Sequence, residues 1–162
     1  MLDALEDFRE TVEGGAARLL SITEEESERR VAEGKWSAKE IVGHLIDSAA
    51  NNHQRFVRAQ FTDELDFQGY EQEAWVAAQC YQQESWPQLV ALWRAYNQHL
   101  RHVVSCIPQD KLKQLRARHN LDRIAWRLVS REQPATLEYL IRDYIAHLKH
   151  HLSQIFTEES QI

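Results

Sequence analysis

The sequence has few residues that break helices, with five glycines and three prolines among 162 residues. Leucine, alanine, glutamate, glutamine and arginine are abundant instead, and these residue types favour helix over sheet. A chain of this length is about one domain long and can bury one sizeable core. We therefore expect a single all-α domain that spans residues 1–162.

Long apolar runs and an excess of positive charge are also missing. No stretch approaches the roughly eighteen uncharged apolar residues typical of a membrane helix, and the first twenty residues are acidic and amphipathic, unlike a signal peptide. The formal net charge is −6, and acidic and basic residues are interspersed, so no basic stripe is available to bind phosphates. We expect a cytoplasmic protein that binds neither nucleic acid nor a membrane.

Motifs of several reactive or metal-binding sites are absent. Cys80 and Cys106 form no CxxC pair and have no partner at ligand spacing, so we expect two buried free thiols. The sequence contains no Gly-rich phosphate loop, no Gly-x-Ser-x-Gly and no His-Glu-x-x-His. It also lacks Glu-x-x-His, which di-iron bundles use in pairs.

Apolar residues at helical spacing predict four long helices, over residues 2–21, 37–61, 85–107 and 135–156. Ser37 and Glu40 have the spacing of a capping box at the start of the second, with Trp36 as its hydrophobic staple. Ser85 is predicted as the N-cap of the third, with Pro87 in its first turn. The four helices are joined by a connector over 23–36, a short helix around 75–76 and a loop with helical turns over 109–135.

Histidines interrupt the apolar stripe of the last predicted helix. His147 and His151 are four residues apart, so their side chains project from one face and could bind the same cation. His44, beside the inward face of the second helix, could supply a third ligand. Three neutral imidazoles suit Zn²⁺, Ni²⁺ or a similar divalent metal and leave coordination positions open, as catalytic sites do. The alternative is three separate, partly exposed or hydrogen-bonded histidines without a metal.

Three polar residues near these histidines are weaker candidates for the site. Asp143 lies four residues before His147 and could accept a hydrogen bond from it, but a carboxylate early in a helix can equally serve the helix dipole or face solvent. Ser48 and Asn51 could line a substrate cavity or simply pack where helices cross. We expect the other five histidines on the surface: His53, His99, His102, His119 and His150.

Several segments together resemble the DinB-like superfamily, including its YfiT-like members: GKWSAKEIVGHLIDSAANNHQRF, GYEQEAWV, SWPQLVALW and TLEYLIRDYIAHLKHHLSQI. The resemblance covers most of the chain and is weakest between Ile107 and Gln133. It implies a four-helix bundle, which we expect to be antiparallel, and a divalent metal on three histidines, one from the second helix and two from an HxxxH pair on the last. His44, His147 and His151 match these positions.

The resemblance also implies metal-dependent chemistry on a small molecule. Characterised members include thiol-dependent S-transferases and isomerases, and others are assumed to be hydrolases, so the fold by itself does not choose between them. We expect either transfer of a low-molecular-weight thiol to an electrophile or hydrolysis, carried out by a homodimer. The alternative is a non-catalytic, stress-associated module in which the metal only stabilises the helix bundle.

Overall fold

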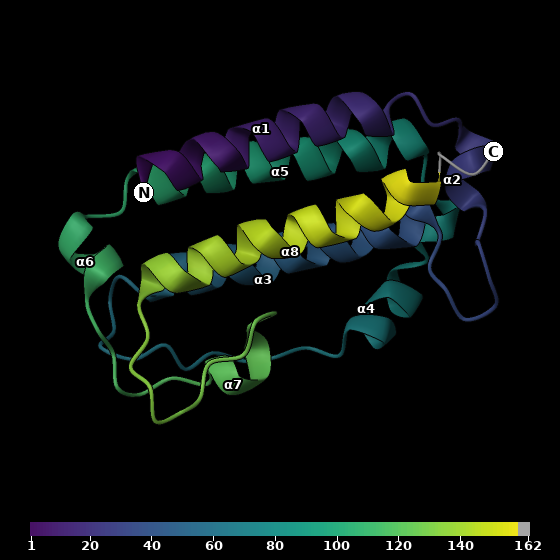
Figure 1. Cartoon of the computed structure of the whole chain (residues 1–162). Coiled ribbons are helices and arrows are strands. Elements are labelled where there is room, and N and C mark those ends of the chain that lie inside the picture. Colours follow the sequence, from purple (N-terminus) through teal and green to yellow (C-terminus); the bar gives the residue numbers. More distant parts are fainter. Residues whose placement is uncertain (159–162) are drawn as a thin grey trace.

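Four long helices form a bundle in the computed structural model, which describes residues 1–158 (Figure 1). They are α1 (Leu2–Leu19), α3 (Ala38–Arg58), α5 (Trp86–Ser105) and α8 (Leu137–Glu158). The connections contain α2 (Glu24–Glu28), α4 (Gln72–Gln79), the 3₁₀ helix η1 (Tyr81–Gln83), α6 (Gln109–Lys113) and α7 (Leu121–Ile124). The predicted all-α four-helix bundle is confirmed. In the part of the chain described, no helix is both long enough and apolar enough to span a membrane.

The four long helices run in two directions. Helices α1 and α3 each pack against both α5 and α8, so these two consecutive long helices lie diagonally across the bundle. Helices α1 and α8 run one way and α3 and α5 the other (Figure 1). The contacts α1/α5 and α3/α8 are therefore antiparallel, as expected from the sequence, whereas α1/α8 and α3/α5 are parallel. Because α3 and α5 are parallel, the chain must return along the bundle between them, over residues 59–85.

The starts of α3 and α5 are fixed by side chains in different ways. Ser37 Oγ accepts a bond from the Glu40 backbone N–H at 3.3 Å, and the Glu40 carboxylate accepts from the Ser37 N–H at 2.9 Å, which confirms the predicted capping box. Ser85 is the N-cap residue of α5, but its side chain makes no capping bond. The carboxylate of Glu24 accepts from the Trp86 N–H at 3.0 Å instead, so α2 caps α5.

The core lies between the four long helices and is centred on large aromatic side chains. Phe8 of α1 and Phe56 of α3 each contact the ring of Tyr144 edge-on, with centroids 5.8 Å apart in both pairs. The buried Tyr144 hydroxyl donates to Asn97 Oδ1 of α5 at 2.6 Å. One side chain of α8 thus contacts residues from all three other helices, and its polar atom is satisfied inside the core.

Two predictions about exposure are wrong. Cys80 and Cys106 are exposed free thiols, and they are the C-cap residues of α4 and α5. His119 is buried, since its Nε2 lies 2.7 Å from the backbone oxygen of Gln133 and its Nδ1 accepts from the Leu121 N–H at 3.2 Å. Both of its nitrogens therefore fix the segment between α6 and α8.

The remaining histidines outside the predicted site follow the sequence more closely. His99, His102 and His150 are exposed, as predicted. His53 is half-buried rather than fully on the surface, because its ring packs against His99 and Tyr96, with centroids 5.1 Å and 5.8 Å away.

Gly43 allows α3 to pack closely against η1. A Cβ at this position would lie 2.1 Å from Cδ2 of Tyr81, whose hydroxyl donates to Asp47 Oδ1 at 2.8 Å. Gly43→Ala must therefore displace this ring, and we expect urea denaturation to show a loss of about 1–3 kcal/mol in the free energy of unfolding.

Gly14→Ala is the matched control, because a Cβ there meets nothing within 4 Å in the middle of α1. It should stabilise the protein by about 0.5–1 kcal/mol, since alanine favours helix over glycine. If Gly43→Ala were also stabilising, the close approach of Tyr81 to α3 would be refuted.

Candidate metal centre

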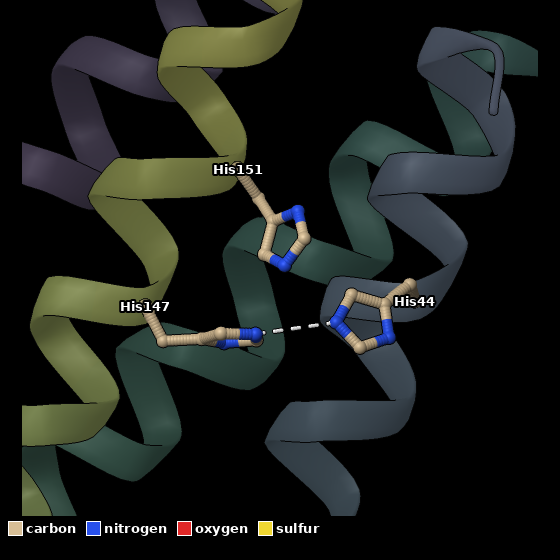
Figure 2. Close-up of side chains that lie close together, drawn as sticks. All are labelled: His44, His147 and His151. Atoms are coloured by element: carbon tan, nitrogen blue, oxygen red, sulfur yellow. Dashed lines mark hydrogen bonds between the residues drawn. The ribbon is translucent and has the colours of Figure 1, made fainter. Parts of the chain in front are cut away.

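Three histidine rings converge between α3 and α8 (Figure 2). His44 comes from α3, and His147 and His151 come from successive turns of α8. One ligand nitrogen from each ring lies within 4.8 Å of the other two. The antiparallel packing of α3 on α8 brings together residues about a hundred positions apart in the sequence, and the four-residue spacing on α8 places two rings on the face that α3 covers.

The arrangement of the ring nitrogens fits a divalent metal. The Nε2 atoms of His44 and His147 are 3.3 Å apart, and two nitrogens that each lie about 2.05 Å from one tetrahedral zinc ion are also about 3.3 Å apart. His151 Nδ1 lies 2.8 Å from Gln154 Oε1, an acceptor, so Nδ1 carries the proton and Nε2 keeps its lone pair. Three imidazole nitrogens are a donor set for Zn²⁺ or Ni²⁺.

Burial keeps the three imidazoles neutral. It lowers the pKa of His44 to about 3 and that of His147 to about 2, and neighbouring histidines add to both shifts because their charges would repel. Burial also lowers the pKa of His151, although the bond to Gln154 opposes this shift. Neutral rings are the form that binds metal, so the site needs no loss of protons at neutral pH.

A polar cavity of about 160 Å³ lies beside the three histidines. Its walls come from α3, α8, the segment around α7, and Tyr70 and Gln72 at the start of α4. The exposed Trp126, which follows α7, lies beside the ring of His147, with centroids 6.4 Å apart. A wider, more open cleft also reaches His151 and is lined by Trp36, whose ring packs at a tilt against His44 with centroids 5.1 Å apart. His147 and His151 therefore border space that a small molecule can enter, whereas His44 is fully buried behind them.

The weaker candidates from the sequence have different positions. Ser48 lines the cavity, but Asn51 is not among the residues that line it, and its amide donates to the backbone oxygen of Asp47 at 2.9 Å. Asp143 also lines the cavity. Its carboxylate accepts from the backbone N–H groups of Trp126 and Arg127, both at 2.8 Å, rather than from a histidine. Asp143 thus holds the segment before α8 over the cavity.

Sequence reasoning missed several residues of this cavity. Asn52 and Arg55 continue the face of α3 that carries His44 and Ser48, and this polar stripe at helical spacing is a signal that could have identified them. Tyr70 and Trp126 come from connections without apolar periodicity, so no pattern in the sequence indicated that they would line the cavity.

The chain belongs to the DinB superfamily, whose family model matches residues 7–155. Among solved structures it is similar to YfiT from Bacillus subtilis, a protein described as a probable metal-dependent hydrolase with an unusual four-helix bundle topology. The two chains share 17% sequence identity and superpose with a TM-score of 0.76 over 96% of this chain and 83% of YfiT. A comparison with curated proteins finds no match. The family and the fold expected from the sequence are thereby confirmed.

Proposed function

We propose that this protein is a divalent-metal-dependent enzyme that acts on a small molecule, either by hydrolysis or by transfer of a low-molecular-weight thiol. The observation that carries the proposal is the convergence of His44, His147 and His151, all neutral, at the edge of a polar cavity. When bound, a divalent metal lowers the pKa of a water or thiol ligand and polarises a carbonyl group. The description of YfiT as a probable metal-dependent hydrolase supports the same class of activity.

The residues around the histidines would bind and shield the substrate. Trp126 and the segment that Asp143 holds cover the cavity and limit the access of bulk water. Among the described residues that line the cavity, Asp143 is the only carboxylate, and both of its oxygens are engaged by backbone N–H groups. The chain thus presents no free carboxylate base in this wall, and the nucleophile would come from outside it, as water or as a substrate thiol.

A substrate panel on Zn²⁺- and Ni²⁺-loaded protein tests the proposal. Release of acid from esters or amides without a thiol would support hydrolysis, and thiol-dependent consumption of an electrophile would support transfer. The activity should disappear on chelation and return when the metal is added back. If neither reaction occurs but chelation lowers the melting temperature, the metal serves the stability of the bundle and the enzymatic proposal is refuted.

A further inference from the structure

A buried arginine lines the same cavity at a distance from the histidines. Arg55, in the last turn of α3, is 6% exposed, and its Nε is buried without a hydrogen-bond partner. Its other two nitrogens donate to the backbone oxygen of Gln68 at 3.3 Å and to Asn52 Oδ1 at 3.4 Å. A guanidinium has five N–H donors, so these long bonds leave most of its capacity unused.

The positive charge of Arg55 has no counter-charge in the part of the chain that the structure describes. It forms no ion pair there, and the one carboxylate in the cavity wall, Asp143, is engaged by two backbone N–H groups. Burial of a charge without a partner is costly, and it lowers the pKa of this guanidinium. Buried charges are normally paired, so an unpaired one in a cavity wall indicates an anionic ligand.

We propose that Arg55 binds the carboxylate of a small substrate whose other end lies at the three histidines. The proposal rests on the function proposed above for the histidine end of the cavity. On one face of α3, His44, Ser48, Asn52 and Arg55 follow each other at helical spacing, and the first and the last are eleven positions apart, which corresponds to about 16 Å along the helix axis. The substrate is therefore extended, with its reacting group and its carboxylate at opposite ends.

The chemistry of the cavity favours a carboxylate over a phosphate. A single buried guanidinium matches the one negative charge of a carboxylate, whereas the second charge of a phosphate dianion would stay buried without a partner. Ile124 and Leu140 contribute apolar surface to the same cavity, which suits a short hydrocarbon chain. Arg123 also borders the cavity, but its side chain is largely exposed and lies near Asp122.

Calorimetric titration of the full chain with hexanoate, hexanamide and inorganic phosphate tests this proposal. The protein is stripped of metal with a chelator, because a carboxylate could otherwise bind the metal directly. Hexanoate should bind at least about tenfold more tightly than hexanamide, as expected for hydrogen bonds to a charged group, and more tightly than phosphate. Arg55→Met should remove the preference for hexanoate, and Arg58→Met, an exposed arginine on the same helix, should retain it.

The proposal would be overturned by any of three results: hexanoate and hexanamide bind equally tightly, phosphate binds more tightly than hexanoate, or Arg55→Met still prefers hexanoate. If circular dichroism shows that Arg55→Met does not fold, wild-type crystals soaked with 6-bromohexanoate decide, because the carboxylate should lie at Arg55 and the bromine toward the histidines. A preference for hexanoate in a protein that never binds metal would refute the proposed function and leave this inference standing. A protein that binds metal but does not prefer hexanoate would refute the role of Arg55 and leave the proposed function standing.

Discussion

Replacement of His147 with alanine is expected to reduce bound divalent metal from about one ion per chain to below about a tenth of that, since only two of three nitrogen ligands remain. His44→Ala should have the same effect, because its Nε2 lies 3.3 Å from that of His147. Elemental analysis after dialysis of equal protein concentrations measures the loss. Any metal-dependent turnover should fall with it, by more than about a hundredfold.

His150→Ala is the matched control for these variants. His150 is exposed on α8, one residue from His151, and its ring packs at a tilt against Trp126 with centroids 5.1 Å apart. Its replacement removes an imidazole from the same helix without removing a proposed ligand, so the metal content should not change. Equal metal content in His147→Ala, His150→Ala and the wild type would exclude the site between α3 and α8.

Features that depend on spacing within one helix could be predicted from the sequence. The capping box at Ser37 needs only a glutamate three residues later, and the shared face of His147 and His151 needs only a separation of four. The bundle itself follows from the apolar stripes of four long segments. In each case the residues that interact belong to the same helix, so their geometry is set by the helix itself.

Features that depend on contacts between distant segments could not be predicted. The parallel pairing of α3 with α5 is set by how the helices pack, and the apolar stripe of one helix does not indicate the direction of the helix beside it. The same holds for His119, which is buried because it bonds to Gln133, and for Asp143, whose partners lie in the poorly readable segment before α8. That segment covers the cavity, so the cavity was harder to predict from the sequence than the three histidines beside it.

A change from pH 7.5 to pH 5.5 is expected to lower the free energy of unfolding of the metal-free protein by roughly 3 kcal/mol. Burial lowers the folded-state pKa of His44 to about 3 and of His147 to about 2, whereas in the unfolded chain both should titrate near 6.5. Below this value the unfolded chain takes up protons that the folded protein does not. The stabilisation is therefore present above pH 6.5 and is lost as the pH falls, by about 1.4 kcal/mol for each ring over this range.

Urea denaturation at several pH values in the presence of a chelator measures this effect. His147→Leu should reduce the pH dependence by about half, because one of the two strongly shifted rings is removed, and His150→Leu should retain it. Burial raises the pKa of Asp47 and Asp143, which acts in the opposite direction at more acid pH, so the range ends at pH 5.5. A free energy of unfolding that does not change between pH 7.5 and 5.5 would mean that the two histidines take up protons in the folded protein, and that they are not held as neutral ligands.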